Sequence, residues 1–387
     1  MGTRNLAIVV YCTVIGFAVL YSTQPLLPLL AEQWGRSIND TALLTTATMV
    51  PLALGPLFYG YILEHVSTKH MLTAAFGVLT LAQFAIANGP DYPLFFVLRS
   101  LQGLMLPAIF TALMTFSSAA GGQHETRKNI TVYIAATILG GYCGRVISGF
   151  LTDLFDWQAA FFFWAGAALL ATWLTTRLAS DPRLRLGKVH LAEIRDLARR
   201  PIYAEGLISA FLLFFVFAAM LNFLPFHMRD NDPGISQSEI ALVYTGYLIG
   251  IAISLASLRL VNLFGGERRT LVIGSSIYLV GTAAFALPGN GLAYASMLVF
   301  AAGMFTLHSV LSAFLNHLET ERKGLINGLY VSAYYAGGAL GSYFPGFLYQ
   351  EYGWSAFILM LLVLLIALIV LSMMLRHAPA PTQTDSR

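Results

Sequence analysis

Two arginines stand inside long apolar runs, Arg99 between residues 92 and 118 and Arg145 between residues 129 and 152. Apolar runs of this length are typical of membrane-spanning helices. A guanidinium inside a membrane costs a few kcal/mol unless it faces a partner or a cavity. Because arginine binds carboxylates and phosphates through charge-assisted hydrogen bonds, the two side chains predict a site for an anion.

The spacing around each arginine leaves two interpretations open. Gln102 follows Arg99 by three residues, so both lie on one side of a helix. Gly141 and Gly149 stand four residues before and after Arg145 and share its face. Each arginine therefore either faces a substrate or has a structural role, Arg99 by tying carbonyl groups of the first apolar run and Arg145 by wedging into a helix contact.

Acidic partners for these arginines are missing from the apolar runs. None of the 19 Asp and Glu residues falls in the middle of a run, and Glu64, Asp153 and Glu205 stand at the ends. His308 is the only histidine well inside a run, and it titrates near neutral pH when unperturbed. It is either a proton carrier or a hydrogen-bonded structural residue.

Other polar and aromatic side chains of the apolar runs are expected to line the same site. In hydrocarbon such groups must find partners in the protein or in a wet cavity. The candidates for substrate contact, besides Arg99 and Arg145, are Tyr21, Gln24, Gln102, Tyr142, Asn222, Tyr244, Tyr247, Tyr334 and Tyr335.

The composition identifies an all-α membrane protein. Hydrophobic residues make up 57% of the 387 residues and charged residues only 11%, far below the roughly 25% of soluble domains. The hydropathy predicts twelve spans, at residues 6–30, 43–63, 71–88, 92–118, 129–152, 158–178, 203–228, 240–262, 270–288, 292–315, 325–349 and 354–375. Cys12 and Cys143 both lie within spans, so no disulfide, metal site or cofactor is expected.

Lysine and arginine collect on alternate loops and predict the orientation. With the N-terminus in the cytoplasm, 17 of the 22 lie on the cytoplasmic side and only Arg36 and Arg229 on the other. Both termini are therefore predicted to be cytoplasmic, in what we expect to be a bacterial inner membrane. The net charge of +3 arises from these loops and does not indicate nucleic-acid binding.

The two halves of the chain repeat each other at an offset of 197 residues. Tyr133, Gly140, Gly141, Gly144, Gly149, Leu151 and Trp157 recur as Tyr330, Gly337, Gly338, Gly341, Gly346, Leu348 and Trp354, whereas Arg145 recurs as Ser342. This repeat predicts two six-helix, pseudo-symmetric halves at residues 1–178 and 203–376. A cytoplasmic linker with an amphipathic helix at 179–202 joins them, and a disordered tail follows at 377–387.

Parallel six-helix repeats are typical of transporters whose halves rock around a site near the middle of the membrane. Rocking halves need surfaces that approach closely without interlocking. Small residues provide such surfaces, so Gly140, Gly144, Gly149, Gly337 and Gly341 are expected to serve the conformational change. The turn after residue 60, with Glu64 and Lys69, is expected to contribute as well.

The chain resembles the major facilitator superfamily over essentially its whole length, in particular the twelve-helix branch of drug and metabolite proton antiporters. Arg99, Gln102 and Gly103 match the Arg-x-x-Gln-Gly signature of that branch. The resemblance implies the major facilitator fold and a role for Arg99 in proton transfer.

Two further patterns match only in part. Gly140, Gly144 and Gly149 resemble the glycine-rich antiporter motif, but Gly144 and Arg145 replace its Gly-Pro dipeptide. The superfamily's Gly-x-x-x-Asp-Arg-x-Gly-Arg loop is degenerate here, because Glu64, His65, Ser67 and Thr68 replace its Asp, Arg, Gly and second Arg.

These observations predict a secondary active transporter that moves a small anionic or amphipathic organic molecule, by proton-coupled efflux. The alternatives are an importer of an organic acid or siderophore-like metabolite by proton symport, and an uncoupled facilitator. Neither a His-Glu-x-x-His nor a Gly-x-Ser-x-Gly pattern of an enzyme occurs. The expected partners are the substrate, protons and membrane lipid, without nucleic acid, and the expected state is a monomer.

Overall fold

The protein is helical throughout the part that the computed structural model describes, residues 3–118, 123–179, 191–319 and 322–375. The first half consists of α1 (Thr3–Tyr21), η1 (Gln24–Leu26), α2 (Leu27–Trp34), α3 (Ile38–His65), α4 (Thr68–Ala87), α5 (Tyr92–Ser118), α6 (Gln123–Leu154) and α7 (Trp157–Thr175). Proline residues at 25 and 28 remove backbone donors, so the first span is divided among α1, η1 and α2.

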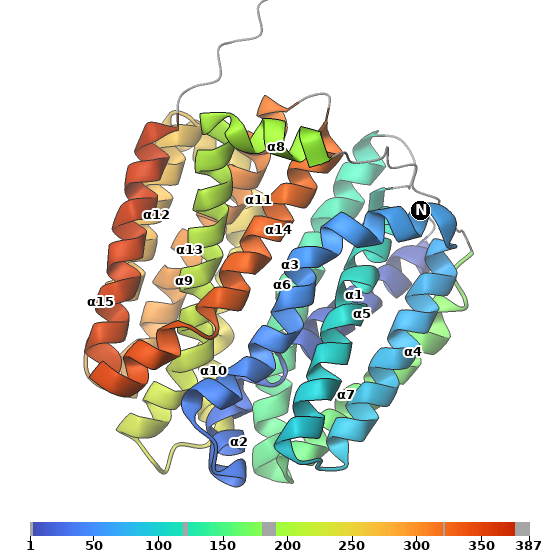
Figure 1. Ribbon diagram of the computed structural model, residues 1–387, viewed down its shortest axis with the longest axis vertical. Coiled ribbons are helices and arrows are strands. Elements are labelled where there is room, and N and C mark those ends of the chain that lie inside the picture. Colours follow the sequence, from blue (N-terminus) through green and yellow to red (C-terminus); the bar gives the residue numbers. More distant parts are fainter. Residues whose placement is uncertain (1–2, 119–122, 180–190, 320–321, 376–387) are drawn as a thin grey trace, which may run out of the picture.

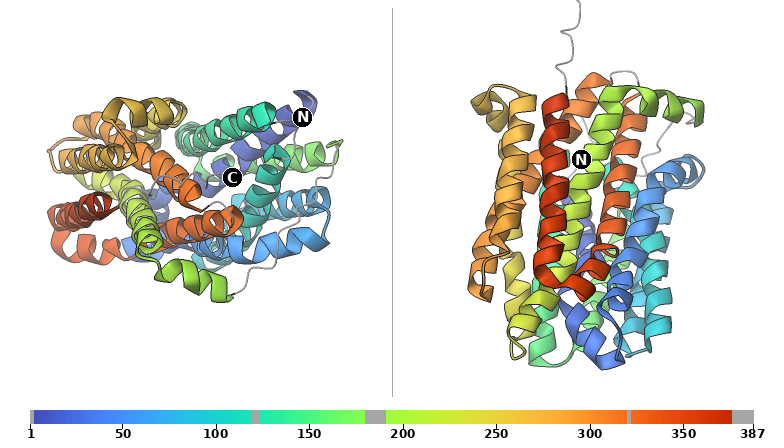
Figure 2. Two further views of the ribbon diagram at one scale, coloured as in Figure 1. Left: turned by 90° about the horizontal axis from the view of Figure 1, so that it is seen from above. Right: turned by 60° about the vertical axis from the view of Figure 1, so that its left-hand side comes forward.

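The second half follows a short helix, α8 (Leu191–Arg199). It consists of α9 (Pro201–Asn231), α10 (Gln237–Leu242), η2 (Val243–Leu248), α11 (Ile249–Phe264), α12 (Glu267–Ala284), α13 (Asn290–Leu318), α14 (Lys323–Gly341) and α15 (Pro345–Met374). Figure 2 shows the two halves as adjacent groups of helices when the molecule is seen from above. Among the described helical segments, nine are long and apolar enough to cross a membrane.

The two ends of the bundle differ. We call the end that carries α8 the linker end, at the top of Figure 1, and the end that carries α2 and α10 the far end. Residues 180–190 of the predicted linker and the predicted tail at 377–387 lie outside the described residues.

The predicted boundaries are wrong near the end of the chain. The span expected at 325–349 ends at Gly341, and α15 begins at Pro345 and bends at Gly353, where φ is +78°. Proline has no backbone N–H and fits the first turn of a new helix, whereas a positive φ favours glycine. Hydropathy is continuous across both points and therefore does not report them.

The 197-residue repeat extends from the glycines to the residues that they contact. A methyl group at Gly144 would overlap the carbonyl oxygen of Ala18 on α1, and one at Gly341 would overlap that of Phe215 on α9. Ala18 and Phe215 are themselves 197 residues apart. Glycine at both positions lets the backbones of neighbouring helices touch, so the same helix pair is built once in each half.

These contacts correct the expected position of several glycines. Gly140, Gly144, Gly337 and Gly341 pack within their own halves and not on the surface between them. Gly149 does face the other half, because a methyl group there would lie 2.5 Å from Cβ of Ala241 on α10. The small-residue pairs therefore bring helices together inside each half. Other residues form the contact surface between the two halves, which we call the seam.

Candidate functional site

Arg145 lies on α6 with its side chain only 1% exposed. Its Nε donates to Oε1 of Gln24 at 2.8 Å, and its Nη1 donates to the carbonyl oxygen of Gly141 at 2.8 Å. Both acceptors are neutral. Among the described residues, no carboxylate forms an ion pair with Arg145, so these bonds hold the guanidinium without neutralising its charge.

Three tyrosines surround this guanidinium. Its Cζ is 4.2 Å from the ring centre of Tyr21, 4.8 Å from that of Tyr244 and 5.3 Å from that of Tyr247. The negative face of an aromatic ring attracts a cation at such distances. Tyr21 belongs to the first half and the other two to the second, so the charge of Arg145 lies on the seam between the halves.

The 3-10 turn η2 explains why two of these tyrosines reach the same group. Side chains three residues apart are nearly eclipsed in a 3-10 helix, which places Tyr244 and Tyr247 together on one side. The Tyr244 hydroxyl donates to the carbonyl oxygen of Leu221 at 2.7 Å, which fixes its ring. A methyl group at Gly141 would lie 3.3 Å from Tyr21 and 3.4 Å from the Tyr247 hydroxyl, so the absence of a side chain there makes room for the cluster.

Arg99 belongs to a different set of contacts inside the first half. Its Nη1 and Nη2 donate to the carbonyl oxygens of Val19 and Leu20 at 3.1 and 2.9 Å, and its Nε donates to that of Leu44 at 3.2 Å. Nη1 also donates to Oε1 of Gln102 at 2.8 Å. The structure therefore brings Tyr21, Gln24, Tyr244 and Tyr247 to Arg145, but places Arg99 against the backbones of α1 and α3 and Gln102 between Arg99 and Gln83.

His308 lies on α13 among aromatic residues of α14. The Tyr330 hydroxyl is 2.8 Å from its Nδ1, and the Tyr334 ring centre is 4.8 Å from its own. Tyr334 stacks on Phe214 at 3.8 Å and meets Tyr335 edge to face at 5.4 Å. His308, the candidate proton carrier, therefore contacts the ring of Tyr334, which in turn contacts that of Tyr335. Both tyrosines are predicted substrate residues.

Asn222 crosses to the first half at the far-end side of the seam. Its Oδ1 accepts from the Thr45 hydroxyl at 2.7 Å, and its Nδ2 donates to the Ser342 carbonyl at 2.8 Å. The hydroxyls of Thr46 and Ser342 are 2.9 Å apart. The threonines were not expected from the sequence, and Ser342 was noted only as the counterpart of Arg145, because hydroxyls within an apolar run usually bond to their own helix.

Asp153 joins the halves near Gly149. Its carboxylate accepts from the backbone N–H of Gln237 at 2.9 Å and from that of Ser238 at 2.7 Å. The sequence places this acid only at a span end, which gives no sign of such a partner. Together with the bonds of Asn222, this contact closes the far end of the seam.

Two helices of different halves, α6 and α11, are separated by a groove toward the linker end. The groove has a volume of about 280 Å³ and is lined by Thr131, Ile134, Ala135 and Ile138 of α6 and by Ile251, Ser254, Leu255 and Ser257 of α11. Its two walls come from different halves, so the chain is closed at the far end and separated between α6 and α11 on the other side.

The remaining candidates are Tyr142, Lys69 and Glu64. Tyr142 is half-buried at the edge of the core. The Lys69 Nζ donates to the carbonyl oxygen of Leu178 at 2.8 Å, which ties α4 to the end of α7. Glu64 lies at the end of α3, but its side chain falls outside the described residues.

Comparisons with known proteins agree with this architecture. The family model described as the Major Facilitator Superfamily matches residues 9–232 and 230–387. The inner membrane transport protein YnfM of Escherichia coli is 26% identical over 92% of this chain and 86% of its own. The uncharacterized MFS-type transporter YybF of Bacillus subtilis is 23% identical over 96% of this chain and 93% of its own.

Solved structures show the same fold. A bacterial homologue of the human lysosomal transporter Spinster, inward-facing and unoccupied, aligns with a TM-score of 0.77 at 12% identity over 98% of this chain and all of its own. The nucleoside transporter NupG aligns with a TM-score of 0.78 at 14% identity over 96% of this chain and all of its own. The protein is a membrane transporter, not an enzyme, and it belongs to the major facilitator superfamily.

Proposed function

We propose that this transporter moves a small anionic or amphipathic organic molecule across the bacterial inner membrane, and that Arg145 binds its negative group. The observation that carries the proposal is a buried guanidinium on the seam, in contact with aromatic rings of both halves. Burying a charge is costly unless it is paired. A substrate carboxylate would supply the negative partner, and the three tyrosine rings would pack against the rest of the molecule.

Rocking of the two halves would carry the substrate across. In the structure, Asp153 and Asn222 join the halves at the far end, and a groove separates α6 from α11 toward the linker end. Exposing the site on the other side requires these far-end contacts to break. Arg145 would then leave Tyr244 and Tyr247, and an anion on its guanidinium would compete with those rings and so favour the opening.

Uptake into proteoliposomes tests the proposed substrate class and its coupling. A panel of radiolabelled organic anions and cations of similar size is offered to the wild-type protein, with and without a pH gradient. We expect exchange of at least one anion, and accumulation of that anion only when the gradient is present. Transport of cations alone would contradict the anion site. Equilibration without accumulation would favour the uncoupled facilitator, and the gradient direction that drives accumulation separates efflux from import.

His308 is our proposed proton carrier, and the role of Arg99 in proton transfer that the family resemblance implies is the alternative to a structural role for that arginine. The support for His308 is its position inside the second half, next to Tyr330 and Tyr334. We expect His308→Gln to abolish accumulation driven by a pH gradient while exchange of labelled for unlabelled substrate continues. The measurement is both assays on one preparation, with His317→Gln, which removes an exposed histidine, as the matched control. Undiminished accumulation in His308→Gln would exclude this residue.

A further inference from the structure

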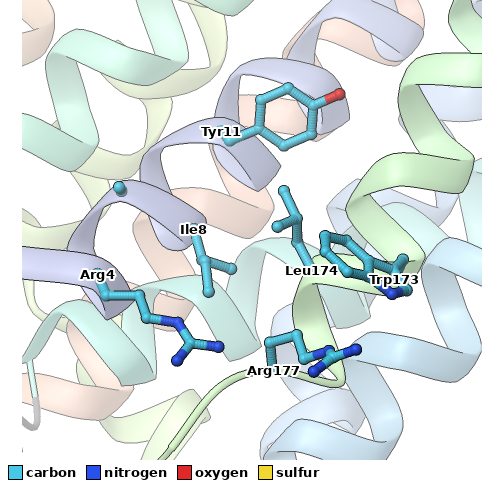
Figure 3. A pocket seen from close by; sticks show the side chains of 7 residues that line it. Arg4, Ile8, Tyr11, Trp173, Leu174 and Arg177 are labelled. Atoms are coloured by element: carbon cyan, nitrogen blue, oxygen red, sulfur yellow. The ribbon is translucent and has the colours of Figure 1, made fainter.

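A groove on the outer flank of the first half plays no part in the proposed transport site. It lies between the start of α1 and the end of α7, has a volume of about 390 Å³ and is lined by Arg4, Ala7, Ile8, Tyr11, Trp173, Leu174 and Arg177. Figure 3 shows Arg4 and Arg177 on one side of the groove and Tyr11 on the opposite side. The groove thus has a basic mouth and an apolar interior.

The interior fits a hydrocarbon chain. Ile8 and Leu174 supply aliphatic walls, and the hydroxyl of Tyr11 already donates to the carbonyl oxygen of Ala167 at 3.0 Å. From Arg4 to Tyr11 the helix rises about 10 Å. Trp173 next to the groove is 52% exposed, and Leu169 and Leu170 on the same helix are 59% and 45% exposed, as expected of a surface that faces lipid.

The mouth fits an anionic group. Arg4 and Arg177 are exposed, and neither has a carboxylate within ion-pair distance in the described part of the chain. The Arg177 guanidinium lies 5.0 Å from the ring centre of Trp173, which holds it at the groove. Two cations that line one opening repel each other, and the planar fork of arginine matches the oxygens of a phosphate.

We propose that this groove binds one anionic phospholipid, with its phosphate between Arg4 and Arg177 and an acyl chain along Ile8 and Leu174 toward Tyr11. The apolar interior distinguishes a lipid from a free phosphate ion, because an inorganic ion would contact the mouth only. The site needs no assumption about the transported substrate.

Native mass spectrometry of the full chain in detergent tests the proposal with dioleoylphosphatidylglycerol and dioleoylphosphatidylcholine as probes. The wild-type protein should retain one phosphatidylglycerol in preference to phosphatidylcholine. Each basic side chain near an anionic headgroup strengthens binding about fivefold, so Arg4→Gln/Arg177→Gln should weaken phosphatidylglycerol binding roughly 25-fold. Arg36→Gln/Arg269→Gln, which removes two exposed arginines elsewhere, should leave it unchanged.

A second variant separates the groove from simple surface attraction. Ala7 is an exposed lining residue, so Ala7→Trp should fill the groove and weaken both lipids while both arginines remain. Equal retention of phosphatidylglycerol by the arginine variant and the wild type would overturn the proposal. So would an Ala7→Trp protein that binds as the wild type does, or complete displacement of the lipid by inorganic phosphate at the same concentration.

Discussion

Arg145→Gln is expected to lower transport of the anionic substrate about 100-fold in proteoliposomes, measured as the initial rate per reconstituted molecule at low substrate concentration. Glutamine keeps hydrogen-bonding groups near Gln24 but has no charge for an anion or for the rings of Tyr244 and Tyr247. The loss should fall mainly on binding, because the missing contact is to the substrate itself. Arg145→Lys keeps the charge without the planar fork, so we expect it to retain an intermediate rate.

The controls distinguish a substrate ligand from a helix contact at Arg145. Arg36→Gln also removes one positive charge, but from an exposed residue that lies 5.1 Å from the ring centre of Tyr92, and it should transport normally. If Arg145 only stabilises the packing of α6, then Arg145→Gln will lower the melting temperature and reduce transport of anions and cations equally. A selective loss of anions in a protein that melts as the wild type does would support the binding role.

The duplicated fold was predictable from the sequence because a repeat constrains both members of each contact. Gly144 predicts a close contact with a neighbouring helix, and its counterpart Gly341 predicts the equivalent contact in the second half. The structure supplies Ala18 and Phe215, which repeat at the same offset. Hydropathy and the glycine spacing therefore carry enough information for the twelve helices and their order in two halves. They do not report where Pro345 and Gly353 interrupt continuous apolar sequence.

The candidate site was only partly predictable, since the sequence gives the depth of a side chain in the membrane more readily than its direction. Arg99 and Arg145 were expected at similar depth and therefore in one site. In the structure Arg145 lies on the seam, and Arg99 points to the carbonyls of Val19 and Leu20. These contacts agree with the second interpretation left open by the sequence, in which Arg99 ties carbonyl groups of the first apolar run. No sequence spacing chooses between the two interpretations, because the carbonyls lie 79 and 80 positions away.

The structure also shows how the two repeats differ at the position of Arg145 and Ser342. Arg145 and its counterpart Ser342 both lie on seams between the halves, Arg145 against Tyr244 and Ser342 against Thr46. Ser342 bonds to neutral groups, whereas Arg145 brings a charge. A duplicated position has thus become a neutral contact in one half and, in our proposal, a binding residue in the other.

Arg99→Ala is expected to destabilise the protein itself by at least about 3 kcal/mol, because the buried carbonyls of Val19, Leu20 and Leu44 each lose a charged hydrogen-bond donor. Those of Val19 and Leu20 belong to the last turn of α1, where a helix leaves carbonyls without backbone partners, and that of Val19 also accepts from the Ser22 hydroxyl at 3.1 Å. Arg99 is fully buried, so these carbonyls are not exposed to bulk solvent when it is removed. Arg99→Lys should recover part of the loss, since one ammonium cannot reach all of the acceptors.

The measurement is thermal unfolding in detergent together with the amount of folded protein per cell. Arg99→Ala should lower both, while the molecules that fold keep the substrate preference of the wild type. Arg269→Gln removes an exposed arginine and should change neither. The alternative expectation, that Arg99 contacts substrate or protons, requires the opposite pattern: a protein that melts normally but has lost transport or its response to a pH gradient. Arg145→Gln is expected to melt normally but to lose transport of the anion. Comparing the two variants therefore decides whether both buried arginines bind substrate, or whether Arg145 binds substrate and Arg99 stabilises the fold.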